Sequence, residues 1–511
     1  MTAPRVRVRF APSPTGPLHM GGVRTALYNF LFARRWGGDF LLRIEDTDQN
    51  RFVPGAESYI LEALKWCGIE PDEGGDKGGP CGPYKQSLRG EIYREAIGRL
   101  LASGQAYLAF DTPEEMEAKR TEAEARGEVW QYDAARRGGM RNGLALPQDE
   151  VERLLATGTP HVVRFRMPDD PEEVVVRDLI RGEVRVSTAV LDDKVMMKAD
   201  GLPTYHFANI VDDHAMGITH VIRGEEWLPS APLHTLLYRA MDWDAPAFAH
   251  LPLILKPTGN GKLSKRDGDA GGFPVFPLDW VDPETGKRSP GYREAGYLPE
   301  AFLNMLLLLG WSPGDDQELM TLAEAAERFD LERVVKSGAR FNPDKARWFN
   351  AQHLRQQPKE VLSAQLAALL PAEAQPTPER CGLLLDMMLE RVDFLHEIAQ
   401  TTWLFQAPDA PDMDLVHKRW KPDTSEMLRA LEAVLADLPQ FAAADVEAAF
   451  QGLLAAQGWS MGALMLPFRI VLTGTGGGPS MFDFAAFLGQ TETLQRLQSG
   501  LARIEALRAQ A

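Results

Sequence analysis

The amino-acid sequence predicts an α/β protein in which a parallel sheet carries an inserted α+β module and is followed by an all-α C-terminal half. Three observations support this prediction. Residues 5–44 follow a strand–helix–strand pattern, the composition becomes strongly charged from about residue 111, and beyond about residue 340 helical periodicity continues with few strand signals. A strand–helix–strand unit of this length implies two parallel strands joined by a right-handed crossover.

The first strand is predicted over RVRVRF, residues 5–10, because its apolar residues share one face and its arginines share the other. Gly37 and Gly38 end the helix that follows, and FLLRI at 40–44 is the second strand. Within that helix the apolar residues recur at helical spacing: Val23, Ala26, Leu27, Phe30 and Leu31. Because ligands of open α/β sheets bind beyond the carboxyl ends of the strands, the residues after each strand are candidates for a site.

Two further helices are predicted around 54–68 and 90–104. The inserted module begins with a helix in TPEEMEAKRTEAEARGEV and continues with three strands predicted to be antiparallel: VVRFRM, EEVVVRD and GEVRVS. The apolar runs of 202–227 and 250–255 would return the chain to the first sheet. The Gly-rich segment 259–272 is predicted to be mobile.

The composition is that of a globular protein, with 44% hydrophobic and 25% charged residues. The net charge of -17 argues against a non-specific nucleic-acid coat, but a local basic surface could still hold a nucleic acid. Three widely spaced cysteines form no disulfide framework, which favours a reducing cytoplasm. The N-terminus lacks the apolar core of a signal peptide, and no apolar run reaches the length of a membrane span.

The turn between the first strand and the first helix reads FAPSPTGPLHMGG, residues 10–22. Helix N-termini present free N–H groups and a positive dipole, and Gly21 and Gly22 would let a nucleotide approach the backbone closely. The turn is therefore a candidate phosphate site, although the G-x-G-x-x-G and G-x-x-x-x-G-K-[ST] patterns are absent. An ordinary turn with a surface histidine, His19, would explain the same residues.

A second motif favours the phosphate site. KLSKR at 262–266 places two lysines three residues apart in a Gly-flanked loop, which alone is typical of a solvated basic loop. Together with P-x-P-T-G-x-L-H-x-G-G upstream, it resembles the two nucleotide motifs of class I aminoacyl-tRNA synthetases. Five longer stretches resemble the bacterial glutamyl-tRNA synthetase family: PSPTGPLHMGGVRTALYNFLFAR, LRIEDTD, YHFANIVDDHAMGITHVIRGEEWL, KLSKRDG and YLPEAFLNMLLLLGWS. The resemblance covers most of the first 350 residues and thins beyond them, where FNPDKARWFN is the clearest piece.

The resemblance implies glutamate–tRNA ligase activity, in which L-glutamate and ATP form glutamyl-adenylate and the glutamyl group passes to the terminal adenosine of tRNA(Glu). It implies His19, Lys262 and Lys265 as catalytic residues, with His19 beside the ATP phosphates and Lys265 on the departing pyrophosphate. This chemistry needs positioned reactants and neutralised phosphate charge rather than a covalent nucleophile. The other residues implied to contact ATP are Pro12, Ser13, Thr15, Gly16, Gly21, Gly22, Glu226, Trp227, Leu263, Ser264 and Arg266.

Gly22 departs from the usual family motif, and Trp227 has a second interpretation. The first motif usually ends in a second histidine, whereas position 22 is glycine here, as in many members of this subfamily. Trp227 could instead be a residue of the core.

A guanidinium binds the side-chain carboxylate of glutamate with a charge-assisted hydrogen bond, which the neutral amide of glutamine cannot form. The resemblance implies that Arg9 and Arg223 face this carboxylate, whereas the other arginines of the first strand are interpreted as surface residues. Glu45 would receive the substrate ammonium, unless residues 45–48 are simply a polar loop. The remaining pocket residues are Ala11, Ser13, Tyr205 and Asn209. Two charge-assisted hydrogen bonds, each worth about 1.5–3 kcal/mol, could separate glutamate from glutamine.

A tRNA partner requires a local basic surface. Over residues 333–359 there are seven Lys or Arg residues and one acid, Asp344, which suits phosphate contacts but also an ordinary solvated helical surface. The resemblance assigns anticodon contacts to Arg391, Arg347 and Trp348. Arginine suits an exposed base edge, although Arg391 could equally be an ordinary helical arginine.

The implied domains follow the family. They are a Rossmann-like catalytic domain in two halves (1–110 and 195–258), an acceptor-binding α+β module (111–194), a connecting, stem-contact domain with the KLSKR loop (259–342), and two anticodon-binding helical bundles (343–407 and 408–511). Magnesium is expected to arrive with ATP. Relatives that bind zinc carry cysteines and a histidine in the module, but AYLAFDT at 106–112 has neither, so no structural zinc is expected. The family suggests a cytoplasmic monomer.

Three rival functions fit part of the pattern. A glutaminyl-tRNA synthetase would share the motifs. A tRNA-modifying paralogue would lack the helical C-terminal half, and a non-catalytic tRNA-binding relative would not need His19 and both lysines. Charging assays with glutamate and glutamine would separate the first of these rivals from a glutamate–tRNA ligase.

Overall fold

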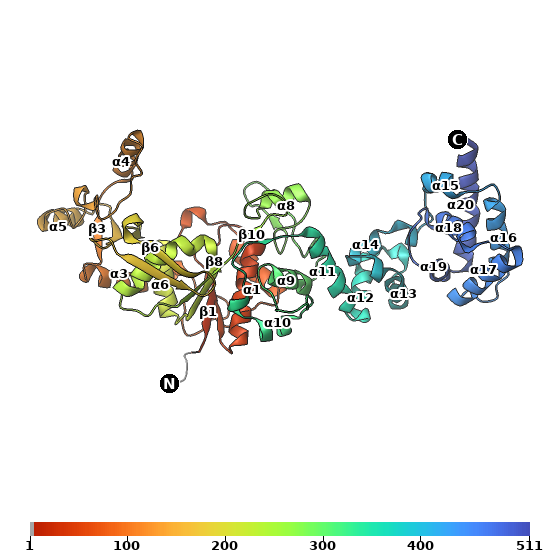
Figure 1. The fold of residues 1–511 in the computed structure, drawn as a ribbon, viewed down its shortest axis with the longest axis horizontal. Helices are drawn as coiled ribbons and strands as arrows, with labels where there is room; N and C mark the ends of the chain where they lie inside the picture. The colour runs from red at the N-terminus through yellow and green to blue at the C-terminus, as the bar shows by residue number, and fades with distance from the viewer. Residues whose placement is uncertain (1–4, 511) are drawn as a thin grey trace. The chain divides into compact units, whose positions relative to one another are not determined.

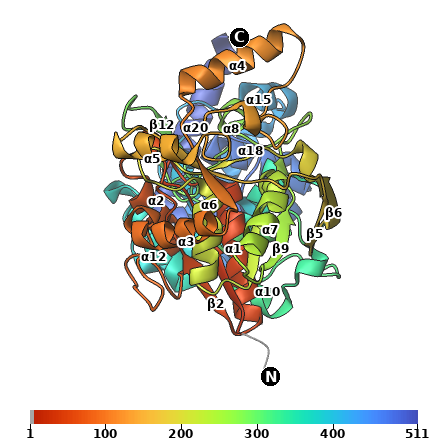
Figure 2. The same cartoon turned by 90° about the vertical axis from the view of Figure 1, so that its left-hand side faces the viewer.

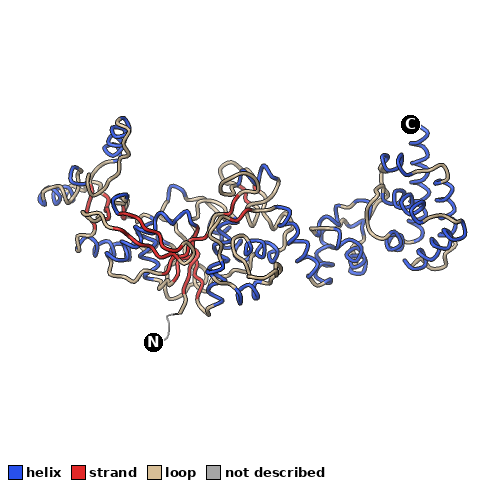
Figure 3. The backbone as a smooth tube through the Cα atoms, in the orientation of Figure 1, coloured by secondary structure: helices blue, strands red, loops and turns tan. Residues whose placement is uncertain are grey.

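The computed structural model describes residues 5–510, which form two compact units, the first ending at Ala346 and the second beginning at Arg347 (Figure 1). Every strand of the described chain belongs to the first unit, as Figure 3 shows in red, so the predicted division into an α/β part and an all-α part is confirmed. The strands are β1 (Arg7–Phe10), β2 (Asp39–Leu42), β3 (Ala106–Ala109), β4 (Val162–Phe165), β5 (Glu173–Asp178), β6 (Gly182–Ser187), β7 (Val195–Met197), β8 (His220–Gly224), β9 (Ala247–Leu251), β10 (Ile254–Leu255), β11 (Trp280–Val281), β12 (Arg288–Ser289) and β13 (Ala339–Arg340).

The centre of the first unit is parallel, as the strand–helix–strand pattern predicted. β1 pairs in parallel with β2, with Arg7 opposite Asp39 and Phe10 opposite Leu42, and helix α1 (Met20–Arg35) is the crossover between them. Beside β1, Thr219 donates its backbone N–H to the Arg7 carbonyl at 2.9 Å, which places the start of β8 next to β1. β8 pairs in parallel with β9. The carboxyl ends of β1 and β8 therefore open on the same edge, which also holds the N-terminus of α1.

The hairpin of β5 and β6 departs from the prediction. Its strands are antiparallel, as expected, but β5 also pairs in parallel with β9 through Asp178 and Phe248. The hairpin thus extends the sheet of β8 and β9 in the order β6-β5-β9-β8, and Figure 2 shows it at that edge. Placing it inside the inserted module was wrong, because alternation reveals the two faces of a strand and not its partner.

The module has a sheet of its own, antiparallel and three-stranded, in the order β3-β4-β7. β3 lies before residue 111 and β7 begins after residue 194, so the expected limits of the module fall inside this sheet. Its helices α4 (Pro113–Ala125) and α5 (Gln148–Ala156) precede β4. Thr112 begins α4 with a capping box, in which its hydroxyl accepts from the Glu115 N–H and its N–H donates to the Glu115 carboxylate.

The chain returns to the sheet through β8 and β9, as predicted, after helix α6 (Tyr205–Ala215), whose buried residues recur at helical spacing. A helix also forms in the Gly-rich segment, and one side chain differs from its prediction. The Gly-rich segment 259–272 contains helix α8 (Lys265–Gly271), because Ser264 bonds Asp267 through its N–H (2.9 Å) and its hydroxyl (2.6 Å). Arg7, interpreted as a surface residue, is mostly buried and donates to two acids, Asp39 and Glu73, at 2.8 Å each.

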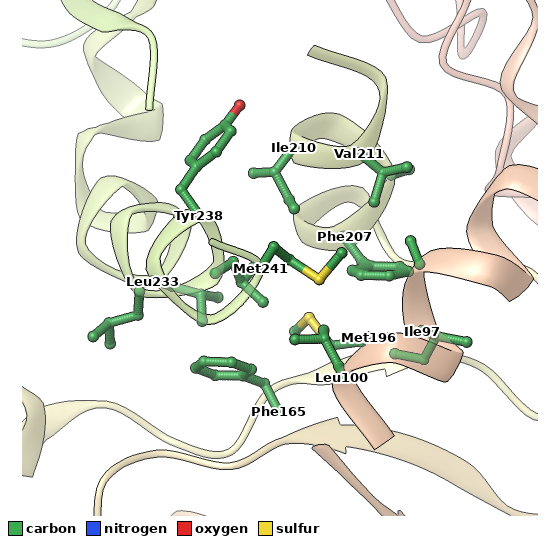
Figure 4. Close-up of a cluster of buried hydrophobic side chains, with 14 of the residues drawn as sticks. Ile97, Leu100, Phe165, Met196, Phe207, Ile210, Val211, Leu233, Tyr238 and Met241 are labelled. Atoms are coloured by element: carbon green, nitrogen blue, oxygen red, sulfur yellow. The ribbon is translucent and has the colours of Figure 1, made fainter. Parts of the chain in front are cut away.

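One hydrophobic cluster fixes α6, the helix that carries part of the candidate site. α6 packs on α3 (Gly90–Ala102), α7 (Ala231–Ala240) and the module strands β4 and β7 (Figure 4). The residues labelled there are Ile97, Leu100, Phe165, Met196, Phe207, Ile210, Val211, Leu233, Tyr238 and Met241. Each large apolar side chain buried in this way contributes about 1.5–3 kcal/mol, so the helix is held rigidly.

The remaining helices of the first unit are α2 (Ala56–Trp66), α9 (Pro299–Leu308) and α10 (Leu322–Arg328). α11 (Pro343–Gln356) spans the boundary between the two units. The second unit continues with α12 (Lys359–Leu369), α13 (Pro378–Met388), α14 (Leu395–Gln400), α15 (Met413–Arg419), α16 (Thr424–Ala436), α17 (Ala443–Gln457), α18 (Met461–Thr473), α19 (Met481–Leu488) and α20 (Gln490–Gln510). Over residues 5–510, no helix combines the length and apolar character that a membrane crossing requires.

Candidate active site

A cleft of about 520 Å³ opens at the carboxyl ends of β1 and β8, beside the N-terminus of α1. This is the edge where open α/β sheets bind ligands. Many of its lining residues come from segments far apart in the sequence: the turn after β1, α6, the end of β8 and the KLSKR segment. The first unit alone supplies all of them.

His19 begins helix α1 and lines the cleft. Its Nδ1 accepts the backbone N–H of Gly21 at 3.2 Å, so the ring proton of the neutral imidazole lies on Nε2. Nε2 is enclosed and bonds to no group among the described residues. Burial, with a smaller contribution from the charge of Lys262, lowers the pKa of His19 to about 4. At neutral pH, His19 is therefore an uncharged N–H donor without a protein acceptor, which suits a phosphate oxygen.

The two glycines after His19 differ in their surroundings. A Cβ added at Gly22 would lie 2.5 Å from Leu18 Cδ1, whereas one added at Gly21 would meet only His19 Nδ1 at 3.7 Å. A side chain at position 22 would therefore require Leu18 to move.

Replacing Gly22 with alanine is expected to lower the free energy of unfolding by about 1–3 kcal/mol, because the added methyl overpacks against Leu18. Gly21→Ala is the matched control in the same helical turn. It should gain about 0.5–1 kcal/mol from helix propensity while its methyl narrows the cleft that Gly21 lines. Urea denaturation of both variants measures the difference, and equal stabilities would contradict the packing argument.

The two lysines of the KLSKR segment reach the same region as His19. The Lys262 ammonium donates to Glu226 Oε1 at 2.9 Å, and both residues line the cleft. The Lys265 ammonium lies 6.0 Å from the centre of the Phe276 ring, and the His19 ring packs edge-on to the same phenylalanine at 5.9 Å. His19 and Lys262 thus line one cleft and Lys265 approaches a ring that packs on His19, although about 245 positions separate the histidine from the lysines in the chain.

Another part of the cleft lies over a buried ion-pair network. Arg9 holds Asp213 with two bonds, from Nε at 2.9 Å and from Nη2 at 3.2 Å, and Arg43 Nη1 donates to the same carboxylate at 2.7 Å. Glu45 Oε1 accepts from Arg43 Nη2 at 3.0 Å and from Asn209 at 3.1 Å. Burial nevertheless raises the pKa of Glu45. A further cation beside this carboxylate would stabilise its charged form.

Arg223, in β8, is 5% exposed and lines the cleft. Its Nε donates to His250 Nε2 at 3.1 Å, and its Nη1 donates to the Tyr205 hydroxyl at 3.0 Å and to His234 Nδ1 at 3.4 Å. Nη2 donates to the Trp227 carbonyl at 3.4 Å. No carboxylate within residues 5–510 forms an ion pair with this guanidinium. A buried and uncompensated positive charge of this kind favours an anionic ligand.

Most of the predicted ligand residues line this cleft. All of the residues predicted for glutamate do so: Arg9, Ala11, Ser13, Glu45, Tyr205, Asn209 and Arg223. Of those predicted for ATP, the lining includes Pro12, Ser13, His19, Gly21, Gly22, Glu226, Trp227 and Leu263. Thr15, Gly16, Ser264, Lys265 and Arg266 are not part of it. Trp227 is 38% exposed and packs on Tyr205 with ring centres 4.1 Å apart, so it is a wall of the cleft and not a core residue.

Sequence reasoning missed other lining residues. Arg24, from the second turn of α1, is buried and donates to the carbonyls of Leu309 (2.7 Å) and Pro252. Ile222, Pro252, Leu253 and Ile254 supply apolar walls. Their backbone positions could have been inferred only from the pairing of β8 with β9, which has no local signal in the sequence.

The basic run over 333–359 carries less free charge than its composition suggests. In the first unit, Lys345 pairs with Glu318 at 2.5 Å. In the second unit, Arg347 pairs with Asp393 (2.9 Å) and Glu397 (2.8 Å), Arg355 with Glu390 (3.0 Å), and Lys359 with Asp386 (2.6 Å). Acids from outside the run thus compensate four of its seven cations, which the sequence count could not show.

The three residues predicted for the anticodon differ in environment. Arg391 is exposed. The pKa of Arg469 is lowered mainly by the burial of Arg469 and, to a smaller extent, by the charge of Arg391. Arg347 is held by its two acids, and Trp348 is partly buried.

A parallel sheet with a histidine at the start of its first crossover helix and a lysine-rich segment returning to the same cleft defines a class I aminoacyl-tRNA synthetase. The family model for tRNA synthetases class I (E and Q), catalytic domain, matches residues 5–348, and the one for the anticodon binding domain matches residues 345–501. Within this class the chain belongs to the family of glutamate–tRNA ligases.

Relatives and solved structures agree on that family. The chain is 54% identical to the glutamate–tRNA ligase of Bacteroides fragilis over 98% of its own length and 99% of the relative, and 54% identical to that of Porphyromonas gingivalis, over 97% and 98%. A crystal structure of a glutamate tRNA ligase from Elizabethkingia meningosepticum in complex with its amino acid superposes with a TM-score of 0.94 at 50% identity. It covers 98% of this chain and 99% of that one.

Proposed function

We propose that this chain activates L-glutamate with ATP and transfers the glutamyl group to the 3′-terminal adenosine of tRNA(Glu). One observation carries the proposal: the buried and uncompensated guanidinium of Arg223 opens on the same cleft as the unpartnered Nε2–H of His19. A cleft with separate anion sites suits a dicarboxylic amino acid beside a triphosphate. Membership of the glutamate–tRNA ligase family supports the same assignment.

In the first step the α-carboxylate of glutamate attacks the α-phosphorus of ATP, and pyrophosphate leaves. His19 donates its Nε2–H to a phosphate oxygen, and Lys262 and Lys265 offset the negative charge that grows on the departing pyrophosphate. Lys262 must exchange its bond to Glu226 for one to phosphate, whereas Lys265 has no ion pair to break within the described chain. Positioning and charge neutralisation account for the whole step, so no covalent nucleophile is required. Magnesium would arrive with ATP and shield its phosphate charge.

The pocket recognises glutamate by charge. Arg223, with Arg9 beside it, binds the side-chain carboxylate, and Glu45 binds the α-ammonium with help from Asn209. Tyr205 forms a wall of the same pocket and accepts from Arg223 at 3.0 Å. Glutamine would leave the charge of Arg223 without a partner, and sites that leave buried polar groups unpaired reject the wrong substrate by about 10⁴–10⁵-fold.

In the second step a ribose hydroxyl of the terminal adenosine attacks the activated carboxyl group, and AMP leaves as the ester forms. The inserted module would hold the acceptor end of the tRNA. The second unit, with Arg391, Arg347 and Trp348, would hold the anticodon in two helical bundles, and the match of residues 345–501 to an anticodon binding domain supports this role. Arg391, which is exposed, is the best placed of the three to contact a base. We place the enzyme in the cytoplasm as a monomer without structural zinc. Its three free cysteines fit a reducing compartment.

Aminoacylation of separately purified tRNAs for glutamate and glutamine tests the proposal. Glutamate should be charged onto tRNA(Glu) with release of AMP and pyrophosphate, and glutamine should be charged onto neither tRNA. Efficient charging of glutamine would contradict the assignment of Arg223 to the side-chain carboxylate.

A further inference from the structure

Arg223 is surrounded by neutral hydrogen-bond acceptors, in contrast to Arg9. Arg9 donates two hydrogen bonds to the carboxylate of Asp213, and this carboxylate also neutralises the charge of Arg9. Arg223 donates to two histidines, a tyrosine hydroxyl and a backbone carbonyl. The closest of the histidine contacts is His250 Nε2, 3.1 Å from Arg223 Nε. His250 can accept this bond only while its Nε2 carries no proton. The group that keeps the proton on Nδ1 of His250 therefore also keeps Arg223 in place without neutralising its charge.

Asp178 holds His250 in that state. His250 Nδ1 lies 2.6 Å from Asp178 Oδ2, and both side chains are buried with 0% exposure. Because the carboxylate can only accept, Nδ1 carries the proton, and the lone pair of Nε2 faces Arg223. Burial works against the charged form of Asp178, but the bonds from His250 and from the N–H groups of Arg181 and Ile180 hold its pKa below the ordinary value. Burial also lowers the pKa of His250, which keeps the imidazole neutral.

The hairpin of β5 and β6 brings Asp178 to this position. Asp178 is the last residue of β5 and the one that pairs with β9, at Phe248. Its Oδ1 accepts the N–H groups of Ile180 (3.0 Å) and Arg181 (2.8 Å), and that of His250 at 3.3 Å. The residue that attaches the hairpin to the sheet of β8 and β9 is thus also the residue that orients His250.

We propose that Asp178 and His250 are positioning residues that set glutamate specificity through Arg223. The imidazole fixes the Nε edge of the guanidinium with a neutral acceptor. It also stands between the guanidinium and the carboxylate of Asp178, so the charge of Arg223 stays available for the substrate. This inference rests on the proposed reading of the glutamate side chain by Arg223. It goes beyond that proposal because neither Asp178 nor His250 is among the residues lining the cleft.

Two substitutions of His250 separate positioning from structural support. In His250→Asn the short amide can still bond Asp178 but cannot reach Arg223; in His250→Gln the longer amide oxygen can accept from Arg223 but leaves Asp178 Oδ2 unpaired. The expected KM for glutamate in tRNA charging rises about tenfold in His250→Asn, the loss of one hydrogen bond to a charged group, and less than threefold in His250→Gln. The KM for ATP should stay within about twofold in both. Stability should follow the opposite order, with His250→Gln the less stable variant.

Asp178→Asn provides a second test that changes no volume. The amide oxygen would keep the backbone N–H bonds, so the amide N–H₂ faces His250 Nδ1 and forces the ring proton onto Nε2, toward the donor Nε of Arg223. The KM for glutamate should again rise about tenfold with the KM for ATP unchanged.

Four results would overturn the inference: an unchanged KM for glutamate in both His250→Asn and Asp178→Asn, an equal rise in both Michaelis constants, a KM for glutamate higher in His250→Gln than in His250→Asn, or a His250→Asn variant less stable than His250→Gln. Arg223→Gln distinguishes the two levels of the proposal. If Arg223→Gln leaves the KM for glutamate unchanged, the proposed role of Arg223 fails and this inference fails with it. If Arg223→Gln raises the KM for glutamate but the His250 and Asp178 variants do not, only the positioning role of Asp178 and His250 is wrong.

Discussion

Replacing Lys265 with alanine is expected to lower the rate of tRNA charging by about 10²–10³-fold, the usual cost of removing one group that stabilises charge in the transition state. The ammonium of Lys265 lies near the phenylalanine ring that packs on His19. It forms no ion pair among residues 5–510, although its charge contributes to lowering the pKa of Asp282 after that residue's hydrogen bonds with Thr285. It is therefore available to the pyrophosphate as that group departs. The dissociation constant for tRNA should not change, because the effect is confined to the chemistry. Single-turnover charging and tRNA binding, measured on the same preparation, give the two quantities.

Lys287 provides the matched control. It is an exposed lysine that bonds Asp269 of α8 at 3.2 Å, so it lies near the same helix as Lys265. Within residues 5–510 it forms no ring contact with Phe276 or His19. Lys287→Ala should charge tRNA at the normal rate. Lys262→Ala should fall between the two, because Lys262 begins from a bond to Glu226. Normal charging by Lys265→Ala would remove that residue from the mechanism.

Replacing Arg223 with glutamine is expected to lower kcat/KM for glutamate by about 10²–10⁴-fold. The side-chain carboxylate would lose its cationic partner in a buried site, and removing one partner of a buried ion pair costs about 3–5 kcal/mol. The KM for ATP should stay near its normal value. Steady-state charging with glutamate as the varied substrate measures the loss, and the same assay with glutamine should show little change, because glutamine gains nothing from the guanidinium.

Arg223→Lys is the informative companion. It keeps the charge but loses the planar fork, so its kcat/KM should lie between those of the wild type and Arg223→Gln. If the lysine and glutamine variants lose activity equally, geometry and not charge governs recognition. If glutamate and glutamine lose kcat/KM in equal proportion, Arg223 does not read the side chain.

Local patterns were enough to predict the layout of the fold. Alternation in residues 5–10, the apolar spacing of the first helix and Gly37-Gly38 predicted β1, α1 and β2 in parallel, and the loss of strand signals predicted the helical second unit. What failed was the assignment of partners over long distances. β5 reads as a strand of the module because nothing near residue 178 indicates Phe248, seventy positions away.

The candidate site shows the same division. Family resemblance indicated His19, Arg9, Glu45 and Arg223, and each of them lines the cleft. The residues that set their chemical state were not visible: Asp213 neutralises Arg9, and Asp178 orients His250. These are buried contacts between segments more than seventy residues apart, so no spacing in the sequence marks them. The count of charges over 333–359 overstated the free positive charge for a different reason. The acids Glu318 and Asp386 lie outside the run, each 27 positions from the lysine that it pairs with.

A crystal structure of the chain with glutamate and an ATP analogue that cannot be split between the α- and β-phosphates tests the account most directly. The account predicts a phosphate oxygen within hydrogen-bond distance of His19 Nε2, the β- and γ-phosphates at Lys265, and the side-chain carboxylate of glutamate on Arg223. A triphosphate bound away from His19 and Lys265, or a glutamate side chain that avoids Arg223, would contradict it.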